Sequence, residues 1–108
     1  MISIVGGAGF LGTYLAKRLL DQDIEFEIID KRVSKQFPQN SKIADINEFD
    51  ELVSAVTGTI VVHLAGIHGD KKVDPLEYTR VNVEGAQNIH RVCSLKNINK
   101  IIFMSSVA

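Results

Sequence analysis

Three glycines near the amino terminus have the spacing of a phosphate-binding turn. Gly6, Gly9 and Gly12 form a G-x-x-G-x-x-G run between the apolar stretch 2–5 and the amphipathic stretch 10–21. The first glycine permits a tight turn, the second lets the backbone approach a pyrophosphate, and the third allows a helix to pack closely on a strand. Backbone N–H groups and the dipole at the start of that helix favour negative charge. Glycines also end strands for steric reasons alone, but the context here is correct on both sides.

An acidic residue lies at the position where a dinucleotide-binding fold places a carboxylate that binds the adenosine ribose. Asp30 ends the second apolar segment, eighteen residues after Gly12, close to the spacing expected for a carboxylate that binds the ribose hydroxyls. Lys31 and Arg32 come next and leave two interpretations open. They form a solvated turn, or they contact a 2′-phosphate and admit NADP. Because Asp30 repels that phosphate, we expect NAD.

The segments that must position these residues alternate between strand and helix patterns. We expect strands at 2–5, 25–30, 42–44, 59–64 and 101–104. We expect helices at 10–21, from a cap at Asn47 to Gly58, and from Pro75 to about Lys96. Alternation of this kind indicates a parallel sheet with right-handed crossovers. The fold class is therefore α/β, a Rossmann-type doubly wound sheet in the order 3-2-1-4-5, with a ligand crevice beyond strands one and four.

Composition favours one domain with a small-molecule partner. A chain of 108 residues with 45% hydrophobic content can bury one modest core, so we expect a single domain over 1–108. Twelve basic against thirteen acidic residues give a formal net charge of -1, which does not point to nucleic acid or to a membrane surface. No apolar run approaches the roughly 20 residues that span a bilayer. The single cysteine fits a reducing compartment, so we expect a cytoplasmic protein.

The remaining candidates for chemistry favour structural interpretations. His63, His68 and His90 lack the spacing of metal ligands, so we expect no metal site. Cys93 lies on an apolar stripe without a basic neighbour, and we expect a small, buried and unreactive side chain. The charged stretch 70–74 is typical of a solvated loop, although a loop after the fourth strand can also contact substrate.

Together these segments resemble the extended short-chain dehydrogenase/reductase family, which includes NAD-dependent nucleotide-sugar epimerases and dehydratases. The resemblance rests on VGGAGFLG at 5–12, Asp30, Asp45-Ile46, HLAG at 63–66, PLEYTRVNVEGAQNI at 75–89 and IIFMSS at 101–106. It implies the cofactor half of an enzyme that acts on a sugar nucleotide. Val5 stands where the family has Thr, which removes a side-chain hydrogen bond but leaves the phosphate turn intact.

The resemblance also implies roles for individual residues. It implies that the pyrophosphate contacts Gly6, Phe10 and Leu11, and that Asp45 and Ile46 flank adenine. It also implies that the cofactor is lined on the side of the fourth strand by Leu64, Ala65 and Gly66, and that Asn82 lies near the cofactor loop. Ser106 aligns with the family's active-site Ser/Thr and is our candidate catalytic residue.

The family's catalytic tyrosine and lysine have no counterpart in these residues. Tyr14 is followed four positions later by Arg18, and Tyr78 by Asn82, so no Tyr-x-x-x-Lys occurs. In the family that tyrosine takes a proton from the substrate hydroxyl, and the lysine lowers its pKa from about 10. We expect both residues after position 108, so that the 108 residues alone are inactive. The alternatives are a non-catalytic NAD(P)-sensing module and a related NADP-dependent reductase.

The stretch 75–96 carries two apolar stripes and suggests self-association. One stripe holds Leu76, Val83, Ala86, Ile89 and Cys93, and the other holds Val81, Gly85 and Val92. A helix packed on a sheet alone needs only one such stripe. The hydrophobic strand 101–104 would also leave an open edge, which is a template for association. We therefore expect a homo-oligomer.

Overall fold

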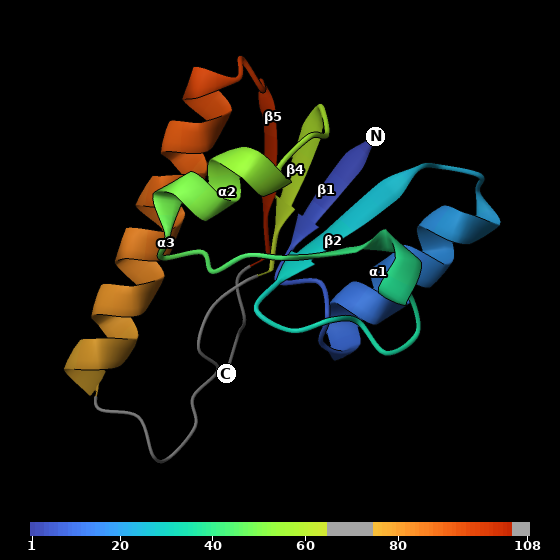
Figure 1. Ribbon diagram of the computed structural model, residues 1–108, viewed down its shortest axis with the longest axis horizontal. Coiled ribbons are helices and arrows are strands. Elements are labelled where there is room, and N and C mark those ends of the chain that lie inside the picture. The colour runs from blue at the N-terminus through green and yellow to red at the C-terminus, as the bar shows by residue number, and fades with distance from the viewer. Residues whose placement is uncertain (65–74, 105–108) are drawn as a thin grey trace.

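The computed structural model describes residues 1–64 and 75–104, in which strands and helices alternate (Figure 1). The elements are β1 (Ile2–Val5), α1 (Phe10–Asp21), β2 (Phe26–Asp30), a 3-10 turn (Pro38–Asn40), β3 (Ser41–Ile43), α2 (Phe49–Ala55), β4 (Ile60–His63), α3 (Pro75–Leu95) and β5 (Lys100–Phe103). The predicted segments are all present, with ends that differ from the prediction by a few residues at most. Within the described residues, no helix is long and apolar enough to cross a membrane.

The strands form one parallel sheet in the order β3-β2-β1-β4-β5. At its centre, Val5 of β1 is aligned with Ile29 of β2 on one side and with His63 of β4 on the other. From β1 the chain first adds β2 and β3 on one side of the sheet. It then crosses back and adds β4 and β5 on the other side, so the direction of strand order reverses between β1 and β4. A crevice opens beyond the carboxyl ends of strands at such a reversal. The predicted fold class and strand order are confirmed.

Helices cover both faces of the sheet, with α1 on one side and α2 and α3 on the other (Figure 1). Successive strand residues point to opposite faces. Ile4 therefore packs with Leu19 of α1, whereas Val5 belongs to a cluster with Leu52 of α2 and Val92 of α3. Two apolar layers thus hold β1 from both sides and fix the position of the turn that follows it.

The start of α2 differs from the prediction. The helix begins at Phe49 with Glu48 as its N-cap, and it ends at Ala55, before Gly58. Asn47 thus lies one residue before the N-cap, and its Nδ2 atom donates a hydrogen bond to the carbonyl oxygen of Val81, 3.2 Å away on α3. The predicted cap is therefore wrong, and the side chain instead ties the loop before α2 to α3.

The two stripes of α3 also face differently from the prediction. Gly85 and Val92 are buried within the chain, whereas Leu76 and Val83 are exposed. The reason is that α3 contacts α2 as well as the sheet, so residues from both stripes are buried within the chain. The expectation that Gly85 and Val92 are free for self-association is therefore wrong, whereas Val81 is half-buried and self-association stays a prediction.

A buried carboxylate lies inside β2, although the alternating pattern of this strand suggests a solvated face. Glu27 is 4% exposed. Its carboxylate accepts hydrogen bonds from Ser3 Oγ at 2.5 Å, from the N–H and Oγ1 of Thr57 at 2.7 Å each, and from Lys42 Nζ at 2.7 Å. Burial alone raises the pKa of Glu27, but the hydrogen bonds from Lys42, Ser3 and Thr57 together hold the pKa below its ordinary value.

This pKa shift makes the stability of the fold depend on pH. Because the folded-state pKa is the lower one, ionised Glu27 adds stability above the unfolded-chain pKa of about 4.3. That stability is lost as pH falls through the folded-state pKa. We expect Glu27→Gln to lower the free energy of unfolding at pH 7 by about 2 kcal/mol, because Lys42 and the hydroxyl and N–H donors lose the negative charge that they face. The variant should also lose less stability than the unaltered protein between about pH 4.5 and pH 3.

Urea unfolding across this pH range measures both effects. Glu25→Gln is the matched control, since Glu25 precedes the same strand and is exposed. Parallel pH profiles for Glu27→Gln and the unaltered protein would show that Glu27 does not carry the acid sensitivity.

Candidate functional site

The glycine turn joins β1 to α1 at the edge of the sheet where the strand order reverses. Gly6 has a φ of 82°, in the left-handed region that favours glycine. A Cβ atom on Gly12 would lie 2.3 Å from the Cα and O atoms of Gly7, so this glycine lets α1 approach the turn. A Cβ atom on Gly9 would meet only Arg32 Nη2, at 3.8 Å. Gly9 therefore faces open space while Gly12 is packed against backbone.

The first turn of α1 is available to an anion. Gly9 is its N-cap and supplies no side-chain hydrogen bond. The first N–H groups of a helix have no partners within the helix, and together with the dipole they attract negative charge. Phe10, which begins α1, is 89% exposed. An anion placed over this turn would therefore meet backbone donors beside an accessible aromatic ring.

The carboxylate of Asp30 is fixed beside this turn. Its Oδ2 atom accepts a hydrogen bond from the N–H of Ala8 at 3.0 Å, and its Oδ1 atom accepts one from the N–H of Arg32 at 3.4 Å. These bonds connect the end of β2 to the glycine turn. Each carboxylate oxygen can accept further hydrogen bonds, so Asp30 can still bind two neighbouring hydroxyl groups.

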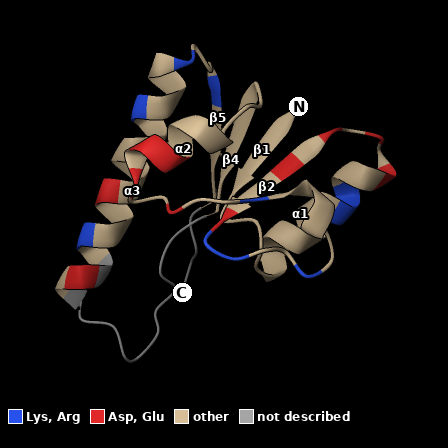
Figure 2. Cartoon of the chain, in the orientation of Figure 1, with Lys and Arg blue, Asp and Glu red and all other residues tan. Residues whose placement is uncertain are grey.

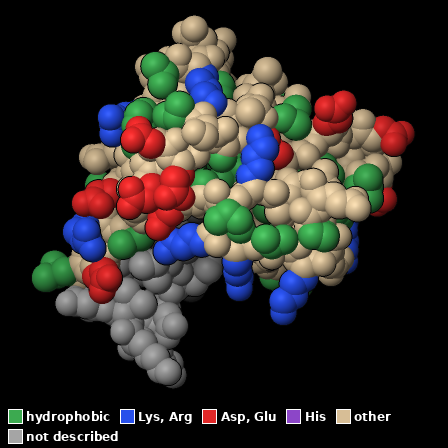
Figure 3. Space-filling model, viewed as in Figure 1, with side chains coloured by type: hydrophobic (Ala, Val, Ile, Leu, Met, Phe, Trp, Pro, Cys, Tyr) green, Lys and Arg blue, Asp and Glu red, His purple; other side chains and the backbone are tan. Residues whose placement is uncertain are grey.

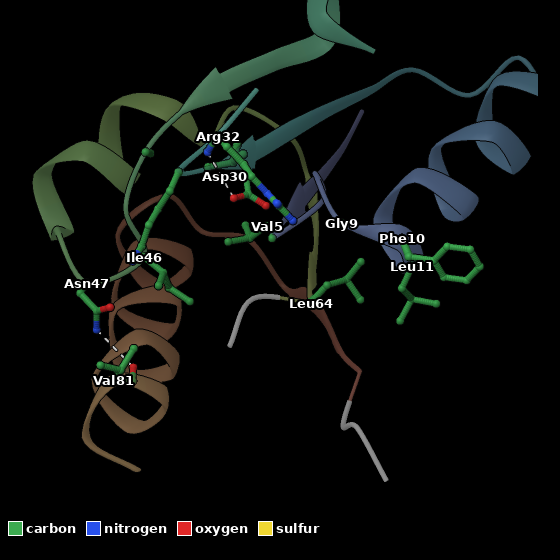
Figure 4. A pocket seen from close by; sticks show the side chains of 14 residues that line it. Val5, Gly9, Phe10, Leu11, Asp30, Arg32, Ile46, Asn47, Leu64 and Val81 are labelled. Carbon is green, nitrogen blue, oxygen red and sulfur yellow. Dashed lines mark hydrogen bonds between the residues drawn. The ribbon is translucent and has the colours of Figure 1, made fainter. Parts of the chain in front are cut away.

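A cavity of about 530 Å³ lies beyond the carboxyl ends of β1, β2 and β4 (Figure 4). Its volume is within the range of small-molecule sites. Its walls are the glycine turn with the start of α1, the end of β2 with the following loop, and the loop before α2 with one residue of α3. The lining residues are Val5, Gly6, Gly9, Phe10, Leu11, Ile29, Asp30, Lys31, Arg32, Ala44, Ile46, Asn47, Leu64 and Val81.

The structure brings together most of the residues that the sequence assigns to a cofactor. Nine of them line the cavity: Gly6, Gly9, Phe10, Leu11, Asp30, Lys31, Arg32, Ile46 and Leu64. Gly12 is buried behind the turn, and Asn82 is half-buried on α3 away from the lining. Ala65, Gly66 and the candidate catalytic Ser106 lie outside the described residues.

Asp45 is not among the residues that line the cavity, and its place beside adenine stays a prediction. Its Oδ1 atom accepts a hydrogen bond from the N–H of Asn47 at 2.9 Å, and its Oδ2 atom lies 4.0 Å from Lys31 Nζ. The carboxylate is thus occupied in its own loop and with the neighbouring loop. Ile46 alone of this pair faces the cavity.

Sequence reasoning missed five lining residues, namely Val5, Ile29, Ala44, Asn47 and Val81. Val5 and Ile29 lie at the carboxyl ends of β1 and β2, where the switch point places the crevice, so their positions in the expected strands could have identified them. Asn47 and Val81 line it because the loop before α2 packs on α3, and no local sequence pattern reports that contact.

The two basic residues after β2 diverge. Lys31 lies near Asp45, where acidic side chains gather over the start of α2 and the adjoining part of α3 (Figures 2 and 3). The side chain of Arg32 instead extends toward Gly9 (Figure 4). Of these two cations, Arg32 is the one placed to meet a phosphate at the glycine turn.

Other groups in the described residues show no comparable arrangement. His63 lies in β4 against the ring of Phe103, with ring centroids 5.1 Å apart. Cys93 is buried, and burial raises the pKa of its thiol. Within residues 1–64 and 75–104, no three His, Cys, Asp or Glu side chains are grouped to hold a metal ion.

The fold and the cavity define a class of protein, the Rossmann-type domains with a ligand crevice at the switch point of the sheet. The particular family follows from comparison with known proteins. The model of the NAD dependent epimerase/dehydratase family matches residues 2–108. The chain belongs to this family, and the resemblance noted in the sequence is confirmed.

Individual relatives cover more than one chemistry. The chain is 32% identical over 108 residues to N-acetyl-alpha-D-glucosaminyl-diphospho-ditrans,octacis-undecaprenol 4-epimerase of Escherichia coli O157:H7, a match that covers 99% of this chain and 32% of that protein. It is 34% identical over 116 residues to the 3 beta-hydroxysteroid dehydrogenase/Delta 5→4-isomerase of Monkeypox virus, covering 97% of this chain and 33% of that protein. The chain thus spans about a third of the length of these relatives.

The fold matches that of solved epimerase structures. The UDP-glucose 4-epimerase of Thermus thermophilus, solved in complex with NAD, superposes with a TM-score of 0.85 at 26% identity. That match covers 97% of this chain and 37% of the solved chain.

Proposed function

We propose that these residues form the NAD-binding part of an NAD-dependent nucleotide-sugar epimerase or dehydratase, with NAD in the cavity over the glycine turn. The observation that carries the proposal is the position of Asp30, whose carboxylate is held by the N–H of Ala8 at the wall of that cavity. Membership of the NAD dependent epimerase/dehydratase family supports it, as does the NAD bound to the similar Thermus thermophilus enzyme.

The described residues fit such a ligand in three places. The N–H groups at the start of α1 would bind the pyrophosphate, which can approach because Gly9 has no side chain. Asp30 would accept hydrogen bonds from the adenosine ribose hydroxyls. Ile46 would contact adenine from the opposite wall. When bound, NAD supplies a nicotinamide ring that accepts and returns hydride.

The role that we assign to this chain is to bind and orient the cofactor. Its sequence contains no Tyr-x-x-x-Lys, so no described side chain is assigned to proton transfer at a substrate hydroxyl. We propose that the 108 residues are inactive by themselves. Ser106 stays our proposed catalytic residue, through its alignment with the family's Ser/Thr.

Calorimetric titration with NADH and NADPH tests the proposal. We expect NADH to bind and NADPH to bind at least about tenfold more weakly, because Asp30 repels the 2′-phosphate. Asp30→Asn should reduce this preference, since the amide keeps the shape of the side chain but carries no charge. The absence of binding of either nucleotide to a folded sample would contradict the proposal. Tighter binding of NADPH would show that Arg32 outweighs Asp30.

A hydroxysteroid dehydrogenase is the second candidate, favoured by the 34% identity to the viral steroid enzyme. Both candidates would use the cavity in the same way and differ in the fate of the hydride. An epimerase returns it to the sugar and accumulates no NADH, whereas a steroid dehydrogenase releases NADH in proportion to product. Assays with UDP-hexoses and with hydroxysteroids, on a protein that carries these residues together with a Tyr-x-x-x-Lys, would distinguish the two.

A further inference from the structure

The wall of the cavity that faces the glycine turn is held from behind by α3. Ile46 and Asn47 form this wall together with Val81 (Figure 4). Asn47 Nδ2 donates a hydrogen bond to the carbonyl oxygen of Val81 at 3.2 Å, and Asn88 Nδ2 donates one to the carbonyl oxygen of Ile46 at 2.9 Å. The loop before α2 is therefore tied to α3 at two separate points along the helix, through the side chain of Asn47 and through the backbone of Ile46.

A glycine lies between these two points. Gly85 is buried inside α3, and a Cβ atom there would lie 2.8 Å from Ile46 Cδ1 and 3.0 Å from Ile46 Cγ1. Glycine is a poorer helix former than alanine, so this position favours alanine by helix propensity alone. What glycine provides here is room for the side chain of Ile46.

The side chain of Ile46 has few directions in which to move. It packs against the core cluster that includes residues of α2 and α3, its carbonyl is held by Asn88, and its remaining side faces the cavity. A methyl group on Gly85 would therefore push Ile46 into the cavity. Because cores are close-packed, a displaced side chain moves toward open space.

We propose that Gly85 and Asn88 are positioning residues for the adenine side of the cavity, setting its width by fixing Ile46. This inference rests on the proposed function, in which NAD occupies the cavity with adenine against Ile46. Neither residue lines the cavity, so both act through Ile46 and the backbone of its loop.

Gly85→Ala in the whole 108-residue chain tests this role. We expect the affinity for NADH to fall about tenfold, equivalent to about 1.4 kcal/mol, without a matching loss of thermal stability. AMP, which carries only the adenine half, should lose affinity by a similar factor, whereas nicotinamide mononucleotide should not. A purely structural defect would weaken both halves together. Gln87→Ala, at an exposed position of the same helix, is the matched control.

The double variant Gly85→Ala/Ile46→Val examines the contact itself. Valine lacks the Cδ1 atom that the new methyl group would meet at 2.8 Å, so the double variant should recover most of the affinity for NADH and AMP. If Gly85→Ala fails to fold, Asn88→Ala provides the same test through the hydrogen bond to Ile46, with a loss again confined to the adenine half.

The outcomes separate this proposal from the proposed function. If the unaltered protein binds no NADH, the proposed function fails and this inference fails with it. If the unaltered protein binds NADH but Gly85→Ala binds equally well, only the positioning role is overturned. A loss that Ile46→Val does not restore would likewise overturn it.

Discussion

Gly9→Val should abolish NADH binding while leaving the protein folded. Gly9 has φ −82° and ψ −171°, an extended conformation that any residue adopts. A Cβ atom there meets only Arg32 Nη2, at 3.8 Å, so valine fits the protein without NAD. Its methyl groups would occupy the space in which a pyrophosphate approaches the backbone. We expect an affinity loss of at least about 100-fold, or about 2.7 kcal/mol, by calorimetry.

The same samples must be compared by urea unfolding, because a misfolded variant would also fail to bind. Ser54→Val provides a control, since Ser54 is exposed on α2 and does not line the cavity. A folded Gly9→Val protein that binds NADH with undiminished affinity would exclude the glycine turn as the pyrophosphate site. That result would leave the fold and the family membership of the chain unaffected.

The topology was predictable because each step follows from a local pattern and a general constraint. The period of apolar residues indicated where strands and helices alternate, and right-handed crossovers then left few arrangements for the sheet. The glycine spacing marked the junction at Gly6 to Gly12. Asp30 was placed correctly at the cavity because it ends the strand beside β1, which the order of elements already implies.

Features that depend on which elements meet were not predictable from the sequence. Two apolar stripes on α3 have the same periodicity whether they contact α2 or a second subunit, so the burial of Gly85 was not foreseen. Asn47 resembles an N-cap in sequence. Its side-chain amide instead donates a hydrogen bond to the carbonyl oxygen of Val81, which lies 34 residues later in the sequence. Glu27 is buried because Lys42 and Thr57 converge on it from later parts of the chain.

The site shows the same division between local and tertiary information. The turn, Asp30 and Arg32 lie within one β-α-β unit, and their motif predicts them together. The opposite wall comes from the loop before α2 and from α3, and the resemblance marked Asp45 and Ile46 there without showing which of them faces inward. The hydrogen bond from the N–H of Asn47 to Asp45 and the proximity of Lys31 are likewise contacts that the sequence does not report.

The third glycine of the turn is expected to control folding, in contrast to the second. Gly12 lies in the first turn of α1, and a Cβ atom on it would lie 2.3 Å from the Cα and O atoms of Gly7. These are backbone atoms, so no change of rotamer relieves the clash, and α1 must move away from the turn. Alanine is better than glycine in a helix by about 1 kcal/mol, but overpacking against backbone outweighs that gain. We expect Gly12→Ala to lower the free energy of unfolding by about 3 kcal/mol, a large part of the roughly 5–15 kcal/mol typical of a domain.

Urea unfolding with linear extrapolation measures the loss caused by Gly12→Ala. Gly9→Ala is the matched control, because it adds the same methyl group three residues earlier, where a Cβ atom meets only Arg32 Nη2 at 3.8 Å. It should lower the stability by no more than about 1 kcal/mol, the cost of replacing a glycine N-cap. The comparison separates the two demands that the glycine run places on the chain, since one glycine keeps space for a ligand and the other keeps α1 against the sheet. Equal stability of Gly12→Ala and Gly9→Ala would mean that α1 can shift at little cost. The close approach of Gly12 to Gly7 would then not be what holds the first turn of α1 in place.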